Sequence, residues 1–229
     1  MKTIGLLGGL SWESTVTYYQ CINRQIGERL GDWHCGKISM FSVDFNEYVD
    51  CMQAGQWEQI GCKLAESARR VEAAGADMLL ICTNTMHKMA DTVQESINIP
   101  LVHIGDVTAQ AIRKEGLSTV GLLGTCFTME DNFLRDRLAQ FGINTLVPEK
   151  EDRTRVNSII FDELVKGVVN DASRQEYLRI IEDLRKQGAQ GVVLGCTEID
   201  LLVTPGDTDL PLFDTTAIHV EAAVEAALG

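Results

Sequence analysis

The feature that most constrains the fold is an approximate internal repeat. Three segments of the first half recur in the second half in the same order: KTIGLLGG (2–9) as STVGLLGT (118–125), DMLLICTNT (77–85) as GVVLGCTEI (191–199), and IPLVHIGD (99–106) as LPLFDTT (210–216). The matched residues are 111 to 116 positions apart: Ile4 and Val120, Cys82 and Cys196, Pro100 and Pro211. Since half of the chain is about 115 residues, the repeat spans nearly all of it and predicts two similar folding units.

Within each unit, short apolar runs alternate with amphipathic stretches. The apolar runs predict strands, and apolar residues spaced three and four apart predict the helices between them. The first helix carries Val16, Tyr19, Ile22, Ile26 and Leu30, and the second carries Ile60, Leu64, Ala68 and Val71. This alternation predicts an α/β fold in which each unit has a mostly parallel sheet of about four strands, flanked by helices. We expect one lobe from residues 1–103 plus 215–229 and the other from residues 104–214.

Helix punctuation is clearest in the second half. Ser173 and Glu176 have the spacing of a capping box ahead of an apolar stripe, and Gly188 marks the end of that helix. We expect the last helix, roughly 216–228, to pack back on the first lobe.

Composition excludes several classes of protein. The formal net charge of −13 argues against a nucleic-acid partner, and a chain this acidic must build a local positive site to hold a small anion. No apolar run approaches the roughly 20 residues that a membrane span needs. The N-terminal apolar stretch is interrupted by Gly5, Gly8 and Gly9 and lacks a cleavage site, so we expect a cytoplasmic protein. The seven cysteines form no CxxC pair, so we expect free thiols, most of them packing residues, with no zinc site.

The two cysteine motifs follow the third predicted strand of each unit. Ligands of open α/β sheets bind beyond the carboxyl ends of the strands. If the lobes face each other, the motifs at 82–85 and 196–199 approach one substrate atom from opposite sides. The chemistry that most needs this arrangement removes a proton from one face of a carbon and returns one to the other face.

Polar residues at the same strand ends predict an anion site. Asn84, Thr85, Thr197 and Glu198 lie where a turn or helix begins, and free N–H groups with a positive dipole end bind a carboxylate there. The same field is expected to lower the pKa of a neighbouring thiol. The glycine-rich loop containing Leu10 can bring backbone close to a ligand.

These motifs resemble those of the aspartate/glutamate racemases that work without pyridoxal phosphate. The resemblance rests on GLLGG near the N-terminus, on the Asn84–Thr85 pair, and on GCTE at 195–198, and it covers the full length. It implies two pseudo-symmetric Rossmann-like lobes, no cofactor, a cysteine from each lobe acting as base or acid at Cα, an amino acid substrate and a homodimer.

One position departs from the family motif, which has cysteine directly before Asn-Thr. Here that position is Thr83, and the cysteine lies one place earlier, at Cys82. Since successive strand residues point to opposite faces, we expect Cys82 to pack in its own lobe and Thr83 to hold the catalytic position opposite Cys196. A threonine is a far poorer base than a thiolate, so the two faces should be unequal, with Cys196 serving the L-enantiomer by analogy.

The resemblance also bears on the substrate. The aspartate-specific pattern has an arginine after the second strand, but residues 41–53 contain none. Lys166 resembles a family lysine that contacts a substrate carboxylate, so we expect aspartate or glutamate as the substrate, held by Lys166 and by Leu10, Asn84, Thr85, Thr197 and Glu198.

Other functions fit parts of the pattern. A related cysteine-dependent isomerase or decarboxylase, such as a maleate isomerase or an arylmalonate decarboxylase, would keep the thiol and change the reaction. A non-catalytic amino acid-binding protein would keep the cleft without the thiol at residue 83. A Cys–His hydrolase is a further alternative, with a histidine drawn from His87, His103 and His219. His103 lies in an apolar run, however, and a lone histidine is weak support. A pyridoxal-phosphate enzyme is disfavoured because no lysine stands at a strand end suited to a Schiff base.

Overall fold

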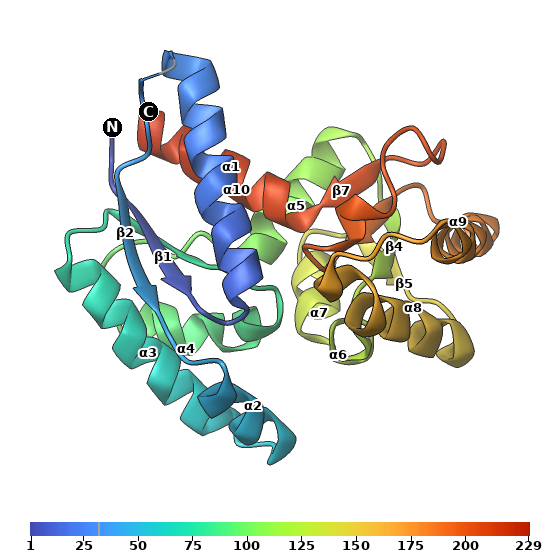
Figure 1. Ribbon diagram of the computed structural model, residues 1–229, viewed down its shortest axis with the longest axis horizontal. Coiled ribbons are helices and arrows are strands. Elements are labelled where there is room, and N and C mark those ends of the chain that lie inside the picture. Colours follow the sequence, from blue (N-terminus) through green and yellow to red (C-terminus); the bar gives the residue numbers. More distant parts are fainter. Residues whose placement is uncertain (32) are drawn as a thin grey trace. The chain divides into compact units, whose positions relative to one another are not determined.

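The computed structural model describes residues 1–31 and 33–229 and divides them into two compact units. Unit 1 comprises Met1–His103 and His219–Gly229, and unit 2 comprises Ile104–Ile218. Each contains a parallel sheet flanked by helices (Figure 1). The predicted α/β class is therefore confirmed.

Unit 1 is built on a three-stranded parallel sheet with the order β2-β1-β3. Its elements are β1 (Ile4–Gly8), α1 (Trp12–Leu30), β2 (Ile38–Ser42), α2 (Asn46–Gln53), α3 (Trp57–Ala73), β3 (Met78–Ile81), the 3₁₀ helix η1 (Thr85–Met89) and α4 (Ala90–Glu95). The predicted fourth strand is wrong, because residues 99–106 contribute only one isolated bridge, from Leu101 to Leu79. Two backbone hydrogen bonds accompany this bridge, from the Leu79 amide to the Pro100 carbonyl oxygen and from the Val102 amide to the Leu79 carbonyl oxygen, each at 2.9 Å, and α5 begins at Ile104.

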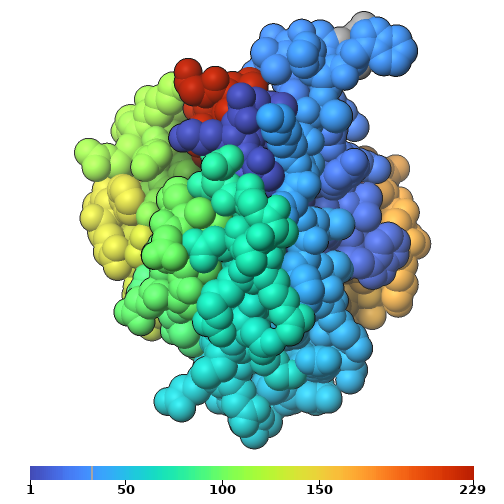
Figure 2. Space-filling model, turned by 90° about the vertical axis from the view of Figure 1, so that its left-hand side faces the viewer, coloured from blue at the N-terminus to red at the C-terminus, as the bar shows by residue number. Residues whose placement is uncertain are grey.

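Strand alternation separates two cores in unit 1. The residues facing α1 include Ile4, Leu6, Met78, Leu80 and Cys82. Those facing α3 include Leu7, Leu79 and Ile81, together with the predicted helix stripe Ile60, Leu64, Ala68 and Val71. Helices α2 and α3, in cyan and teal, lie on the face seen in Figure 2.

The last helix, α10 (Thr215–Leu228), completes the core on the α1 side. Val220, Ala223 and Val224 are buried there, and the Lys2 amide donates to the Ala227 carbonyl oxygen at 2.9 Å. Residues 219–229 thus belong to unit 1.

The buried stripe of α1 differs from the predicted one. Tyr18 is fully buried with Ile22 and Ile26, whereas Val16 and Tyr19 are exposed. Both tyrosines fit a helical spacing, and the choice between them depends on Tyr18 reaching His219 of α10, to which its hydroxyl lies 2.8 Å away.

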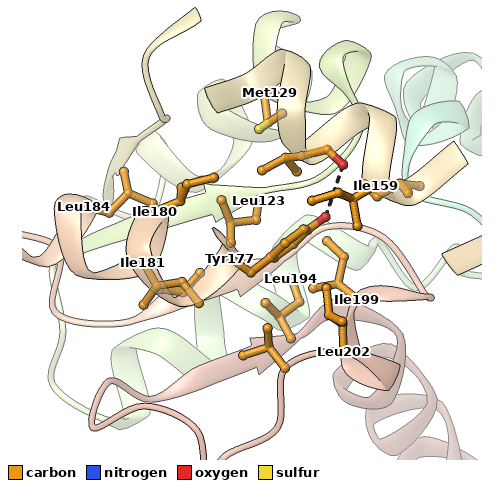
Figure 3. Packing of buried hydrophobic residues seen from close by; sticks show 14 of the residues in the cluster. Leu123, Met129, Ile159, Tyr177, Ile180, Ile181, Leu184, Leu194, Ile199 and Leu202 are labelled. Carbon is orange, nitrogen blue, oxygen red and sulfur yellow. Dashed lines mark hydrogen bonds between the residues drawn. The ribbon is translucent and has the colours of Figure 1, made fainter. Parts of the chain in front are cut away.

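Unit 2 has the predicted four-stranded parallel sheet, with the order β5-β4-β6-β7. Its elements are α5 (Ile104–Lys114), β4 (Thr119–Leu123), α6 (Cys126–Glu130), α7 (Phe133–Ala139), β5 (Asn144–Leu146), α8 (Lys150–Asp162), η2 (Leu164–Lys166), α9 (Asp171–Lys186), β6 (Val192–Leu194), η3 (Ile199–Leu201) and β7 (Leu212–Asp214). Leu123, Val192 and Leu194 pack against α8 and α9. Figure 3 shows this core around Tyr177, whose hydroxyl donates to the Val156 carbonyl oxygen at 3.2 Å.

The predicted capping box of α9 is wrong. The helix begins earlier, with Asn170 as its N-cap, whose side chain accepts from the Ala172 amide. Ser173 lies within the first turn, and its hydroxyl donates to the Glu163 carboxylate at 2.7 Å. Asparagine caps helices at least as well as serine, so the earlier start prevails. The helix ends before Gly188, as predicted, and Gly188 has a φ of 106°.

No helix within residues 1–31 and 33–229 is long and apolar enough to cross a membrane.

Candidate functional site

The pairing register of the two sheets shows which strand-end residues correspond. In unit 1, Leu7 of β1 is paired with Ile81 of β3. In unit 2, Leu123 of β4 is paired with Leu194 of β6. Leu7 and Leu123 hold the same place in the two GLLG segments, so Ile81 and Leu194 are equivalent.

This register places Thr83 in correspondence with Cys196, because each lies two residues beyond the equivalent pair. The sequence match had instead aligned Cys82 with Cys196, and the ladders correct that match by one residue. The structural counterpart of Cys82 is Gly195.

Cys82 is a packing residue. Its side chain is fully buried in the core of unit 1 that faces α1, as predicted. Burial raises the pKa of its thiol far above the usual range, so the group stays protonated and apolar.

Thr83 is partly exposed and stands on a firmly held piece of backbone. Its amide donates to the Ile81 carbonyl oxygen at 2.8 Å. The Ser14 hydroxyl donates to the Cys82 carbonyl oxygen at 2.8 Å, which ties the start of α1 to the end of β3. The His87 ring lies 2.8 Å from the Thr83 carbonyl oxygen through Nδ1, which must carry the proton because a carbonyl only accepts.

Three histidines pack together in unit 1. The His87 ring centroid lies 4.9 Å from that of His103 and 5.4 Å from that of His219. His219 donates through Nε2 to the Val102 carbonyl oxygen at 2.7 Å and accepts from the Tyr18 hydroxyl. Burial lowers the pKa of His219 to about 4 and that of His87 well below its usual range, so both rings are neutral at pH 7. Within the described residues, no group of three or more His, Cys, Asp or Glu side chains could hold a metal ion.

The loop after β1 brings backbone to the same edge of the sheet. Gly9 has a φ of 83°, and a Cβ there would lie 2.2 Å from the Val43 carbonyl oxygen, so only glycine fits. Ser11 has a φ of 142°, and its hydroxyl accepts from the Ser14 amide as the N-cap of α1. The Leu10 side chain is buried in the core, so only its backbone is available to a ligand.

The remaining predicted binding residues lie at turns. Asn84 is buried directly before η1, Thr85 begins η1 and is partly exposed, and Thr197 and Glu198 directly precede η3. Lys166 is exposed at the end of η2, rather than at the end of the helix that carries Val156.

Cys196 follows β6 and is partly buried against the core formed by α8 and α9. The amide of the preceding Gly195 donates to the Leu123 carbonyl oxygen at 2.7 Å, which holds the turn on the neighbouring strand. The Cys196 thiol donates to Glu198 Oε2 across 2.9 Å.

The expected lowering of the thiol pKa is wrong. Burial raises the pKa of Cys196 well above its usual range, and the negative charge of Glu198 and its hydrogen bond add to the rise. The N–H groups of Glu198 and Thr197 act in the predicted direction but are outweighed. The sequence indicates that a helix begins after Cys196, but it does not show that the Glu198 carboxylate contacts the thiol. The helix that begins there, η3, is only three residues long.

Two further acids of unit 2 were not singled out from the sequence. Asp214 ends β7, and its Oδ1 accepts from the Thr216 and Ala217 amides at the start of α10. Burial raises the pKa of Asp214. Loss of hydration and the negative charge of Asp214 raise the pKa of Asp200 to about 6. Asp214 could have been found, because it lies in the third matched segment and ends a strand beside β6.

An arginine also reaches the region after β2, although residues 41–53 contain none. Arg70 of α3 lies over the Phe41 ring at 4.9 Å and is paired with Glu66. Arg70 and Phe41 line a cavity of about 330 Å³, which is also lined by Lys63 and Tyr48. The sequence did not predict an arginine in this region, because Arg70 belongs to the next helix, α3, and lies outside residues 41–53.

Two α/β units with parallel sheets and matched polar turns after the third strands define a duplicated α/β protein. The chain matches the Asp/Glu/Hydantoin racemase family over residues 7–223 and belongs to it.

Two solved structures are similar over their whole length. A proposed Asp/Glu racemase from Yersinia pestis is 46% identical with a TM-score of 0.96, and 100% of each chain is covered. An aspartate racemase homologue from Pyrococcus horikoshii OT3 is 34% identical with a TM-score of 0.92, again with 100% of each chain covered. The glutamate racemase of Hydrogenobaculum sp. (strain Y04AAS1) is 27% identical over 139 residues, which are 60% of this chain and 52% of that protein. These relatives support an amino acid racemase, an isomerase, as the class of enzyme.

Proposed function

We propose that the protein racemises an acidic amino acid, aspartate or glutamate, by removing and returning a proton at Cα without a cofactor. The observation that carries this proposal is the register of the two sheets. It gives Thr83 and Cys196 equivalent places after the third strand of their units, although the residue types differ.

In this reaction Cys196 acts on one face of Cα as the thiolate and Thr83 acts on the other through its hydroxyl. Positioned acid–base groups of this kind typically contribute factors of about 10² to 10⁴ each. An α-proton is only weakly acidic, so N–H groups must also stabilise the enolate-like charge on the substrate carboxylate. The backbone turns at Asn84–Thr85 and Thr197–Glu198 are the candidates for that role, with the backbone of Leu10 and the side chain of Lys166.

The pairing of a thiol with a hydroxyl makes the two half-reactions unequal. Two enantiomers with one stereocentre have equal free energies, so kcat/KM must be equal in the two directions. The individual kcat and KM values can differ. We assign Cys196 to the L-enantiomer, because a family cysteine in the GCTE motif has that role by analogy.

Relatives from two substrate classes support the acidic substrate. One solved structure is an aspartate racemase homologue, and one curated relative is a glutamate racemase. Lys166 is the exposed cation that we propose for the side-chain carboxylate. We also propose a homodimer as the assembly, which size-exclusion chromatography with light scattering would test.

Proton NMR in D₂O tests the reaction with each enantiomer of aspartate and of glutamate in turn. We expect the α-proton signal of one enantiomer to disappear, and Cys196→Ala to abolish that loss. Exchange without inversion would show that Thr83 is a weak partner. A folded sample that binds these amino acids but exchanges no α-proton would overturn the racemase and favour an amino acid-binding protein. Substrate screening with dicarboxylic acids and malonates would then test the isomerase and decarboxylase alternatives.

A further inference from the structure

A side-chain hydrogen bond holds the turn that carries Thr83. The paired register of β1 and β3 ends at Ile81, and the next amide, that of Cys82, still donates to the Leu7 carbonyl oxygen at 3.0 Å. The Thr83 carbonyl oxygen instead accepts from Nδ1 of the His87 ring at 2.8 Å. The residue that holds this carbonyl therefore lies in η1, the 3₁₀ helix that follows the turn.

Both backbone groups of Thr83 are held in this way. Its amide donates to the Ile81 carbonyl oxygen, and its carbonyl oxygen accepts from His87. Because the two bonds lie on either side of the Cα atom, they fix the backbone dihedral angles of Thr83 and the direction of its Cα–Cβ bond. A β-branched side chain then has few accessible rotamers. The bond from His87 therefore helps to decide where the Thr83 hydroxyl points.

The His87 ring is itself held by two other rings. It is buried, and the rings of His103 and His219 make edge contacts with it at centroid distances of 4.9 Å and 5.4 Å. The His219 ring is fixed by the Val102 carbonyl oxygen on one nitrogen and by the Tyr18 hydroxyl on the other. The donor to the Thr83 carbonyl thus has little freedom to turn.

The two supporting histidines lie where the chain passes between the units. Unit 1 ends at His103, before the chain continues into unit 2, and it resumes at His219 when the chain returns. Both rings contact His87 within unit 1. The ring that holds the Thr83 carbonyl is therefore supported by the residues at which unit 1 is joined to unit 2.

The second nitrogen of the His87 ring gives no packing reason for a histidine. With the proton on Nδ1, Nε2 is an acceptor. It is buried, and among residues 1–31 and 33–229 it has no hydrogen-bond partner. A buried polar atom without a partner is unfavourable, and an apolar side chain would fill the space without that cost. What distinguishes histidine from an apolar residue here is the Nδ1–H group, which contacts the Thr83 turn.

We propose that His87 is a positioning residue that keeps the Thr83 hydroxyl directed at the substrate Cα, a role that rests on the racemisation proposed above. The ring acts through the Thr83 carbonyl and takes no part in proton transfer itself. Burial lowers the pKa of His87 well below its usual range, and His103 and His219 add to the effect, so the ring is neutral and its Nδ1 proton stays in place.

The proposal predicts a change in the outcome of the reaction and not only in its rate. In D₂O, the enantiomer whose α-proton Cys196 removes has two fates. A deuteron returned by Cys196 gives exchange with retention, and a deuteron given by the Thr83 hydroxyl gives inversion. His87→Leu fills the space without a donor, so the ratio of inversion to retention should fall at least about 10-fold. A general loss of structure would lower both fates together and leave the ratio unchanged.

His87→Asn is the conservative variant. The asparagine amide nitrogen can occupy the place of Nδ1 and donate to the same carbonyl, while the rest of the ring is lost. It should recover most of the ratio that is lost in His87→Leu. Ile22→Val is the control for lost stability, because it shortens a buried side chain in the core of unit 1 that faces α10. It should leave the ratio at the wild-type value.

The experiment measures the deuterated products of each configuration at early times, by chiral chromatography with mass spectrometry. Circular dichroism checks that each variant is folded. Nitrogen NMR of the histidine rings in the wild type shows which ring nitrogen carries the proton, and it needs no substitution. We expect Nδ1–H for His87 at neutral pH.

A lower ratio in His87→Leu, its recovery in His87→Asn and a wild-type ratio in Ile22→Val would support the proposal. An unchanged ratio in a folded His87→Leu would overturn it, and so would equally low ratios in both His87 variants. If His87→Leu does not fold, the NMR measurement and His87→Asn decide, and a proton on Nε2 or a low ratio in His87→Asn would overturn the proposal.

The wild type separates this role from the proposed function. Exchange without any inversion would overturn the role of His87 alone, because the Thr83 hydroxyl would then deliver no proton. A wild type that exchanges no α-proton would overturn the proposed function and this role with it.

Discussion

The ends of β3 and β6 use one backbone plan with their cysteines displaced by one residue. After β3 the chain continues as Cys82 and Thr83, and after β6 it continues as Gly195 and Cys196. A Cβ at Gly195 would lie 3.1 Å from the Leu123 carbonyl oxygen, so a side chain there would be crowded. In unit 1 the same place holds a buried thiol. A shift of one residue on an alternating backbone therefore separates a packing cysteine from a partly exposed one.

The surroundings of the two ends differ as well. Unit 1 holds all four histidines of the chain, and three of them pack together behind the turn that carries Thr83. Unit 2 has no histidine, and Glu198, Asp200 and Asp214 stand at or near its strand ends. The end that carries the thiol is acidic, whereas the end that carries the hydroxyl is backed by three histidines, of which His87 and His219 are neutral at pH 7.

The two cysteines should respond oppositely to removal of their sulfur. Cys196→Ala should lower α-proton exchange by a factor of about 10³, because a positioned base is lost. Cys82→Ala should keep exchange near the wild-type rate and cost roughly 1 kcal/mol of stability through the cavity it leaves. NMR in D₂O measures the α-proton exchange rate of each variant, and urea unfolding measures its stability. Loss of exchange in a folded Cys82→Ala would break the comparison.

The stability of unit 1 should decrease as the pH falls. The pKa of His219 is lowered to about 4 in the folded state, against an ordinary value of about 6.5, so the unfolded chain binds the proton first. The contribution of the neutral ring is fully present above about pH 6.5 and is lost as the pH falls towards 4, which amounts to about 3 kcal/mol. Asp200 acts in the opposite sense in unit 2, because its raised pKa favours the folded state as the pH falls through about 6.

Tryptophan fluorescence during urea unfolding isolates unit 1, because Trp12, Trp33 and Trp57 all lie there. Hydrogen exchange of peptides from the two units provides the comparison at each pH. His219→Gln should remove the share of the loss between pH 7 and pH 4 that comes from His219, while the share from His87, whose pKa is also lowered, remains. An equal loss in the variant would show that His219 is not its source.

Restoring a thiol after β3 should make the two ends more alike. Thr83→Cys should raise exchange of the α-proton that faces residue 83 by about 10-fold, since a thiolate is a better base than a hydroxyl. Thr83→Ser is the control, because it keeps a hydroxyl and should give no such gain. Rates for each enantiomer in D₂O measure the effect. Equal rates in Thr83→Cys and Thr83→Ser would argue against a proton-transfer role for residue 83.

Both strand ends also have a hydroxyl that caps a backbone carbonyl. Ser14 donates to the Cys82 carbonyl oxygen, and Thr215 donates to the Leu194 carbonyl oxygen at 2.9 Å. Ser14→Ala and Thr215→Val should each cost about 1 kcal/mol, because a buried acceptor loses its donor. Urea unfolding with hydrogen exchange of the two peptides would compare them. A cost in one unit only would show that the ends are not held alike.

The fold class was predictable because strand and helix periodicity survive in both halves of the duplication. The missing fourth strand of unit 1 was not, since residues 99–106 match a true strand in sequence, proline included, and yet form only one bridge to β3. Tyr18 and Tyr19 fit helical spacing equally well, and only the contact with a residue 201 positions later decides between them.

For the site, alternation correctly predicted that Cys82 is buried. The correspondence of Thr83 with Cys196 came from the family motif, and the ladder register supports it independently of that motif. The direction of the Cys196 pKa shift was mispredicted, because it depends on a side-chain contact within a turn. A sequence pattern names the residues of such a turn but not which atoms meet.

The return of the chain to unit 1 has a consequence for the order of folding during synthesis. Residues 219–229 supply His219 and part of the core of unit 1, so that unit lacks an element until these residues have been synthesised. Unit 2 is continuous, and all of its residues are synthesised before these. At about 5–20 residues per second, residues 1–103 must wait roughly 10 s on the ribosome for their missing helix. The turn that carries Thr83 is therefore synthesised early, but unit 1 around it is completed only after unit 2 has been synthesised.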